Sequence, residues 1–235
     1  MRTAVHYLPI VTSALALWFV PQLVRRWRER RPAPHLFWWG LGVALYGAGT
    51  LAESATTLFG WSEPVFRAWY ISGALLGGAP LAQGTAYLLL PRRTADRLTV
   101  TLLAVVAVAA MCVLLSPILL DRVEAHRLSG RVLGWSWVRG FSPFINSYAF
   151  LMLVGGALLS AWRFRGVAGG RGKVLGNVAI AAGGLLPGIG GTFTRFGHVE
   201  VLYMTELAGL LLIYLGYRLN IAAMPAPAPV EVSPA

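Results

Sequence analysis

The stretch LTVTLLAVVAVAAMCVLL, residues 98–115, contains no charged side chain. A helix needs about 20 predominantly apolar residues to cross the hydrocarbon core of a bilayer, so this stretch predicts a transmembrane helix. With its flanks the run covers roughly 98–120, and six further runs lie at roughly 5–24, 36–59, 66–90, 143–163, 174–194 and 199–219. The sequence therefore predicts an all-α, polytopic membrane protein with seven transmembrane helices.

The composition agrees with a membrane domain. Hydrophobic residues make up 57% of the chain and charged residues 12%, whereas soluble domains contain about 25% charged residues. The predicted spans leave room for short loops, so we expect one transmembrane domain over 1–220 and a disordered, Pro/Ala-rich cytoplasmic tail over 221–235. Residues 1–20 resemble a signal peptide, but the basic run directly after them favours an uncleaved first span.

The basic residues are distributed unevenly between the predicted loops. Thirteen of the 20 fall on one face, at 25–31, 92–97, 163–173 and 218. The other seven are Arg2, Arg67, Arg122, Arg127, Arg131, Arg139 and Arg195. Because Lys and Arg accumulate on the cytoplasmic side, this pattern predicts an N-terminus outside and a C-terminus inside the bacterial cytoplasmic (inner) membrane. Because the basic residues follow the predicted membrane orientation, we attribute the net charge of +11 to contacts with a lipid bilayer rather than with nucleic acid.

The longest predicted loop, 121–142, combines basic residues with Trp135 and Trp137. Tryptophan is enriched at membrane–water interfaces, so we expect this loop to lie in the outer headgroup layer. The alternative is a lid over an outward-facing cavity.

Two acidic residues, Glu53 and Glu206, lie inside predicted spans. Each is seven or eight residues from the outer end of its span, which places both carboxylates at a similar depth in the outer half of the bilayer. A charge there costs at least about 2.5 kcal/mol, so such residues face the bundle interior and usually mark a site. Glu53 shares a helix face with Gly42, Tyr46, Gly49 and Thr57, and Glu206 shares one with Tyr203 and Gly209.

Two interpretations of this acidic pair stay open. In the first, the carboxyl groups bind a cation, share a proton or hold a polar solute. In the second, each forms a structural ion pair near the outer boundary, with Arg67 and Arg195 as the available partners. For the first interpretation the predicted substrate-binding residues are Glu53, Glu206, Tyr46, Tyr70, Tyr203, Gln83 and Asn177.

Glycine and proline gather in two of the predicted spans. Residues 183–191 are glycine-rich and contain Pro187, and the span at 66–90 contains Pro80 together with spaced glycines. Such segments are poor continuous helices, and a broken backbone survives in a membrane only where protein or water satisfies it. We expect either interrupted helices that line a cavity, with hinges at Pro80 and Pro187, or close helix packing with a simple kink.

An internal repeat is also predicted. Residues 27–49 align without gaps to residues 162–184 with seven identities, which pairs the first three spans with the last three and leaves the fourth as a linker. Transporters often contain such repeats. The alternative is a chance match in a chain rich in Ala, Gly and Arg.

The first span carries WFVPQLVRRWRERR, residues 18–31, followed by an aromatic-rich second span. This arrangement resembles the first half of PQ-loop proteins, the superfamily of SWEET sugar facilitators and lysosomal amino-acid exporters. The resemblance implies seven helices of 3+1+3 design, a hinge at Pro21, and a lining or gating role for Gln22. The dipeptide does not recur, because Gly156 and Ala157 occupy the aligned position. FRAWYISGALLG at 66–77 also resembles uncharacterised seven-helix actinobacterial proteins, which implies no activity.

Several chemistries are excluded by the residues present. The four histidines are scattered, so neither a metal centre nor haem ligation is expected, and a single cysteine, Cys112, cannot form an intramolecular disulfide. The only lysine, Lys173, lies in a predicted loop, which excludes a retinal Schiff base. No nucleophile–base pair is present within the spans, so we expect neither an enzyme nor a bound cofactor.

The sequence is best interpreted as a small-molecule transporter or facilitator with a polar site in the outer half of the bundle. Its expected partners are the lipid bilayer and a small polar solute or a proton. The alternative is a seven-helix module that senses a ligand or binds a partner without transport. A homo-oligomer or a complex with another membrane protein stays open.

Overall fold

The structure, a computed structural model, describes residues 3–194 and 196–223. The predicted tail lies almost wholly outside the described residues. In the described part the regular structure is helical throughout. The helices are α1 (Leu8–Glu29), α2 (Pro34–Phe59), α3 (Glu63–Trp69), α4 (Ala79–Leu89), α5 (Arg92–Leu115), α6 (Phe141–Ala149), α7 (Gly156–Phe164), α8 (Arg171–Thr194) and α9 (Val199–Ala222). Helix α9 thus continues two residues past the predicted end of the membrane domain.

Two π-helical segments and four 3₁₀ turns complete the described helices. The π segments are Tyr70–Leu75, which continues α3, and Phe150–Gly155, which joins α6 to α7. The 3₁₀ turns are Ala4–Tyr7, Leu120–Arg122, Gly130–Val132 and Ser136–Gly140.

Five helical stretches of the described chain are long and apolar enough to cross a membrane. They are Ala4–Glu29, Arg92–Leu115, Ser136–Phe164, Arg171–Thr194 and Val199–Ala222. The predictions of an all-helical protein and of several apolar helices, compatible with an integral membrane protein, are therefore confirmed. Two predicted spans, 36–59 and 66–90, are absent from this set. The first corresponds to α2, which contains Glu53 and several threonines, and the second is divided between α3 and α4. A count of seven spans and the internal repeat stay predictions.

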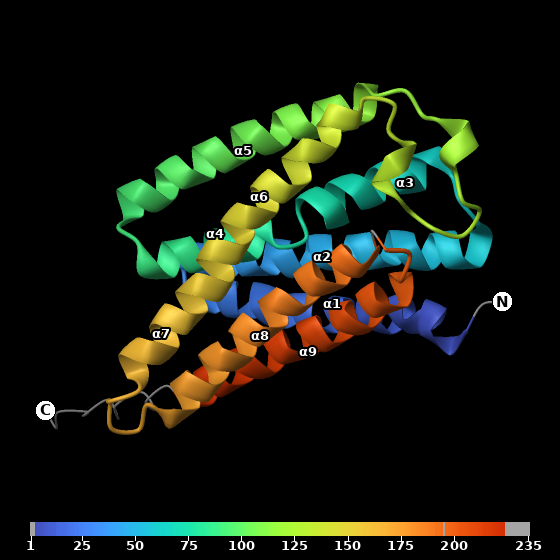
Figure 1. The fold of residues 1–235 in the computed structure, drawn as a ribbon. Coiled ribbons are helices and arrows are strands. Elements are labelled where there is room, and N and C mark those ends of the chain that lie inside the picture. Colours follow the sequence, from blue (N-terminus) through green and yellow to red (C-terminus); the bar gives the residue numbers. More distant parts are fainter. Residues whose placement is uncertain (1–2, 195, 224–235) are drawn as a thin grey trace, which may run out of the picture.

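The helices pack in two layers (Figure 1). Helices α1, α2, α8 and α9 lie side by side, with α8 against α9 and α1 against both α2 and α9. Helix α4 packs on α2, and α5 and α6 cover α4 and the segment 70–75 from the other side. The loops at 30–33, 90–91 and 165–170 lie at the end of the bundle where α9 ends, here called the basic end. The loops at 60–62 and 116–140 lie at the other end, here called the outer end.

Helix α8 is continuous through Pro187, so the expectation of a broken helix there is wrong. Its glycines instead allow close contact with α9. A Cβ on Gly183 would lie 2.5 Å from the carbonyl oxygen of Gly209, and a Cβ on Gly176 would lie 2.9 Å from the carbonyl oxygen of Gly216. Small residues at these positions let the two backbones approach, which is the close-packing alternative.

The backbone is interrupted instead between the segment 70–75 and α4. The carbonyl oxygen of Ala74 accepts hydrogen bonds from the Ser142 hydroxyl at 2.7 Å and from Asn146 Nδ2 at 3.0 Å, both on α6. These donors satisfy a main-chain group near the interruption, as a membrane interior requires. Pro80 lies in the first turn of α4, where proline starts a helix without losing a hydrogen bond. It therefore begins a helix rather than bending one.

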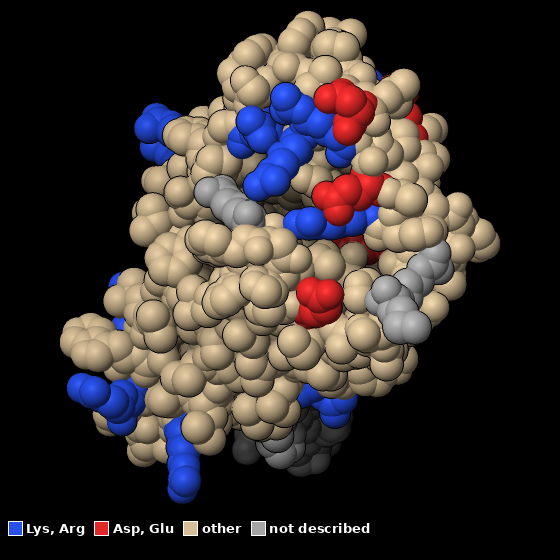
Figure 2. All heavy atoms as spheres, turned by 45° about the vertical axis from the view of Figure 1, so that its right-hand side comes forward, with Lys and Arg blue, Asp and Glu red and all other residues tan. Residues whose placement is uncertain are grey.

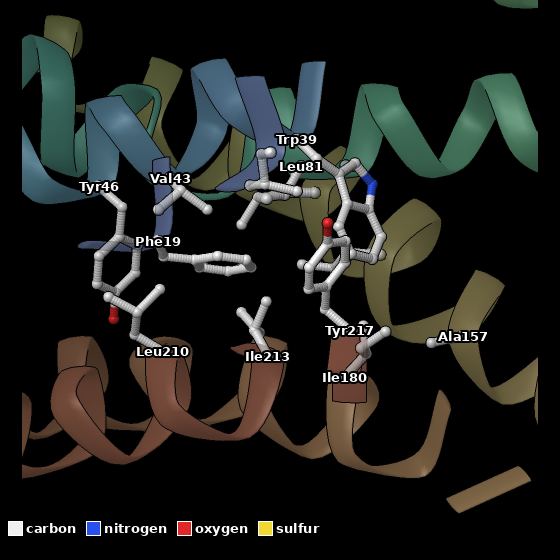
Figure 3. Packing of buried hydrophobic residues seen from close by; sticks show 14 of the residues in the cluster. Phe19, Trp39, Val43, Tyr46, Leu81, Ala157, Ile180, Leu210, Ile213 and Tyr217 are labelled. Carbon is white, nitrogen blue, oxygen red and sulfur yellow. The ribbon is translucent and has the colours of Figure 1, made fainter. Parts of the chain in front are cut away.

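An apolar cluster fills the bundle toward the basic end (Figure 3). Phe19 of α1 is fully buried and its ring contacts Tyr217 of α9 with a centroid separation of 5.2 Å. Trp39 of α2 lies over the same tyrosine, and Ile213 is 2% exposed beside them. These aromatic and branched side chains pack closely and fill this part of the described bundle.

Candidate functional site

Glu53 of α2 and Glu206 of α9 lie together, although 153 positions separate them in the sequence. Their carboxyl groups are close enough to interact electrostatically. Glu53 is only 3% exposed, whereas Glu206 retains partial access and lines a cavity. Two buried carboxylates this close would repel each other, so the geometry suits a pair that shares a proton.

Three aromatic side chains surround the carboxyl pair. Trp69 Nε1, at the end of α3, donates to Glu53 Oε1 at 2.9 Å. The Tyr46 hydroxyl donates to the main-chain oxygen of Glu206 at 2.9 Å. Tyr203 is buried one turn before Glu206. In the described part of the chain, the second oxygen of each carboxyl group is buried without a hydrogen-bond partner. Those two oxygens are the unused polar atoms of the site.

The carboxyl pair borders a cavity of about 390 Å³, here called the inner cavity. Helices α2, α6, α8 and α9 and the segment 70–75 contribute to its wall. It reaches from the pair toward Leu81 and Ile213 of the apolar cluster. Polar members of its lining include Tyr46, Glu53, Trp69, Asn146, Thr192 and Glu206. A volume of this size accommodates a small solute.

A second hollow of about 570 Å³, here called the vestibule, lies at the outer end. Basic side chains gather around a hollow on this face of the molecule, with acidic groups beside them (Figure 2). Three arginines of the outer loop line the vestibule: Arg127, Arg131 and Arg139. Tyr70 and Tyr203 lie in its wall. The loop at 116–140 thus contributes to the wall of the vestibule, and both its position in the headgroup layer and its role as a lid stay predictions.

The vestibule and the inner cavity share part of their walls. Glu53, Trp69 and Ser142 line both. The carboxyl pair therefore lies where the arginine-lined entrance meets the inner cavity, and the apolar cluster closes the other side.

The predicted small face of α2 makes the close contacts that position Glu53. A Cβ on Gly49 would lie 2.9 Å from the Cα of Gly73, and a Cβ on Gly42 would lie 2.9 Å from the main-chain nitrogen of Leu81. Because larger residues would separate these backbones, the glycines bring α2 against the segment 70–75 and α4. Glu53 lies one turn beyond Gly49 on the same face.

Two predicted binding residues lie outside both cavities. Gln83 is fully buried, and its Nε2 donates to Ala95 O at 3.0 Å and to Thr99 Oγ1 at 2.8 Å, while its Oε1 accepts from Tyr148 at 2.6 Å. It therefore ties α4 to α5 and α6. Asn177 donates to Lys173 O at 2.8 Å and to Asn220 Oδ1 at 3.3 Å near the basic end. Both amides have structural partners, so neither is retained as a candidate for solute binding.

The predicted hinges are placed differently from one another. Pro21 is exposed within the continuous helix α1, and Gln22 Nε2 donates to Trp18 O at 3.1 Å one turn earlier. Neither these two residues nor Pro80 lines the vestibule. Pro187 does line the inner cavity, and its ring contacts the space that a Cβ on Gly209 would occupy.

The alternative of structural ion pairs receives no support from Arg67. Its guanidinium binds Glu63 at 2.7 Å, the main-chain oxygen of Ser116 at 2.9 Å and the main-chain oxygen of Val113. Arg67 thus anchors α3 to the end of α5 rather than to a buried acid. Arg195, the other expected partner, lies outside the described residues.

The structure adds site residues that the sequence interpretation missed. Trp69 was not among the predicted binding residues, and the three vestibule arginines were counted only for membrane orientation. No helical periodicity relates a loop arginine to a helix that precedes it by 70 residues or more. A usable signal was the concentration of arginines in the one long outer loop.

The described residues contain no group of three or more His, Cys, Asp or Glu side chains placed to hold a metal ion. No protein-family model, curated protein or solved structure matches the chain. The site must therefore be interpreted from its own geometry: a buried carboxyl pair, flanked by aromatic donors, between an arginine-lined entrance and the inner cavity.

Proposed function

We propose that this chain is a membrane transporter or facilitator for a small polar solute, with the Glu53–Glu206 carboxyl pair as its central site. The observation that carries the proposal is the position of the pair between the vestibule and the inner cavity. Buried acids at membrane depth typically mark solute or proton pathways. Transporter sites are commonly found near the middle of the bundle, beside interrupted helices.

The asymmetry of the bundle supports transport over a static pore. The site is accessible from the outer end, while Phe19, Trp39 and Tyr217 close the bundle toward the basic end. A transporter exposes its site to one side at a time, so this arrangement corresponds to an outward-facing state. The π segments 70–75 and 150–155 and the interruption before α4 border the inner cavity and supply the places where the wall can change shape.

The test is reconstitution into liposomes that contain a pH-sensitive dye. Solutes from a panel of sugars, amino acids and carboxylates are added outside under an imposed membrane potential, and proton entry and labelled-solute uptake are recorded. Uptake of a panel member that requires the protein is expected, and Glu53→Gln and Glu206→Gln should reduce it at least about tenfold, the loss of one charge-assisted contact. Glu29→Gln, an exposed acid paired with Arg25 at the basic end, is the matched control.

A second function stays in competition, because the inner cavity also suits a module that binds a ligand and signals through a partner. Ligand binding without any flux, together with stable co-purification of another membrane protein, would favour that module. Uptake that the two site variants leave unchanged would remove the carboxyl pair from the proposal.

A further inference from the structure

The vestibule has a marked positive charge that the carboxyl pair does not explain. Arg127 donates to the main-chain oxygen of Thr194 at 2.8 Å and lies 3.4 Å from Glu124, so its side chain is held at the wall and is 26% exposed. Arg139 Nε donates to Ser136 O at 3.3 Å. A guanidinium has five N–H donors, and this contact uses one of them. Arg131 lines the same hollow.

The arginines and the carboxyl pair share one space, because Glu53 lines the vestibule as well as the inner cavity. An anion that enters the vestibule is attracted by the guanidinium groups. It is repelled by any negative charge on the pair, and in a partly desolvated site such repulsion is only weakly screened.

We propose that the vestibule binds an oxyanion, the carboxylate, sulfate or phosphate group of a solute or lipid, and that this binding is coupled to uptake of a proton by the Glu53–Glu206 pair. This inference rests on the proposed function and names its substrate class. A pair that holds one proton carries one negative charge, and a second proton from the outer water removes it. The anion and the proton therefore bind together and leave together.

The groups around the pair decide which residues can produce a pH dependence. Tyr46 faces the pair from α2, and Tyr203 from α9. Beyond Tyr203 lie His6, 3.7 Å from Glu200, and Arg127 of the outer loop. The experiment must therefore distinguish an effect of His6 on binding from an effect of the carboxyl pair.

Further groups lie on neighbouring elements. On α3 the pair faces Trp69, which does not titrate, and Tyr70 lies one residue further, near Arg139. In the outer loop, His126 Nδ1 lies 3.3 Å from the main-chain oxygen of Thr56 on α2. His126 is therefore a second histidine to test.

Two sources could supply the oxyanion. A water-soluble anion would enter through the vestibule. An anionic lipid would place its headgroup there and a chain along the inner cavity, whose rim includes the exposed apolar side chains Phe150 and Leu185. The chemistry recognised by the arginines is the same, so separate arms of one experiment can distinguish the sources.

The first arm uses the full chain in neutral detergent and sulfate as the probe, because the charge of sulfate does not change between about pH 5 and about pH 8. Calorimetric titration at constant ionic strength is expected to show sulfate binding about tenfold tighter at the lower pH, the change expected when one like charge in the site is neutralised. Arg139→Gln should weaken binding about tenfold, and Arg139→Lys should restore part of it because the charge returns. Arg122→Gln, exposed and next to Asp121, is the control and should bind normally.

Variants of the pair test the coupling. The double variant Glu53→Gln/Glu206→Gln, which has no carboxyl left in the pair, should still bind sulfate but lose most of the difference between the two pH values. His6→Gln and His126→Gln should keep that difference. If a histidine variant removes the difference and the double variant keeps it, the coupling to the carboxyl pair is wrong.

The second arm compares nanodiscs of dioleoylphosphatidylglycerol and dioleoylphosphatidylcholine, with thermal stability as the readout. Stabilisation by the anionic lipid that Arg139→Gln removes identifies a lipid headgroup as the ligand, whereas sulfate binding alone identifies a soluble anion. Absence of both effects overturns the inference, as does sulfate binding that Arg139→Gln leaves unchanged. Uptake of a neutral solute that anions do not affect would support the proposed transport and refute anion binding in the vestibule. Anion binding without any flux would support the inference and refute transport.

Discussion

The contact between α8 and α9 holds Glu206 in place, and Gly190 is the glycine of α8 where it can be tested most sharply. A Cβ on Gly190 would meet the Thr205 hydroxyl and would lie 2.7 Å from the Cα of Leu202. The neighbouring Gly191 has nothing within 4 Å of the same position. We predict that Gly190→Ala destabilises the protein and that Gly191→Ala does not.

The two substitutions gain the same helix propensity, up to about 1 kcal/mol for replacing glycine with alanine in a helix. Only Gly190→Ala adds a steric cost, and overpacking of a close contact costs about 1–3 kcal/mol. The backbone of Leu202 cannot move aside as a flexible side chain can, so relaxation gives little relief. The difference between the two free energies of unfolding is therefore expected to be about 1–3 kcal/mol.

The assay is unfolding of both variants by sodium dodecyl sulfate in mixed micelles, followed by tryptophan fluorescence. Gly191 lines the cavities, so the comparison concerns stability and not transport. Equal unfolding curves for Gly190→Ala and Gly191→Ala would refute the close packing of α8 on α9. The position of Glu206 on α9 would then need a different explanation.

Three further predictions concern other parts of the bundle. Gln83→Met removes the three hydrogen bonds that join α4 to α5 and α6, so the free energy of unfolding should fall by about 1–3 kcal/mol, while sulfate binding per folded molecule should not change. A large loss of sulfate binding in this variant would indicate that Gln83 belongs to the binding site. Burial, and then the arginines at the end of α1, lower the pKa of His35 in the first turn of α2. The unfolded chain therefore binds the proton more readily, so stability should decrease as the pH falls below about 6.5, and His35→Gln should flatten that slope in unfolding curves at several pH values. A reporter fused after Asn220 should report the cytoplasm, and an extracytoplasmic signal would contradict the orientation predicted from the basic residues.

Much of the fold could be predicted from local sequence features. Apolar runs of sufficient length impose helices because a bilayer interior leaves no other way to satisfy the backbone. Most helices of the described chain accordingly overlap predicted runs, including the run at 98–115 in α5, although the run at 66–90 is divided between α3 and α4. The depth of Glu53 and of Glu206 also follows from counting residues to the ends of their helices.

Local features could not show whether a glycine-rich helix is broken or closely packed. The segment 183–191 and the segment 73–80 have similar compositions, yet α8 is continuous and the backbone near Gly77 is not. The difference lies in the neighbours: α9 presents Gly209 and Gly216 to α8, whereas α6 supplies Ser142 and Asn146 to the main chain beside the interruption.

The sequence alone thus determined the all-helical class, the positions of several long apolar helices compatible with a membrane protein, and the presence of two acids inside helices, because each depends on residues close together along the chain. The tertiary structure decided that the acids meet, that Trp69 and not Arg67 contacts one of them, and that the arginines of the outer loop face the same space. These contacts join residues separated by dozens of positions, and their geometry depends on how closely the glycines let the helices approach.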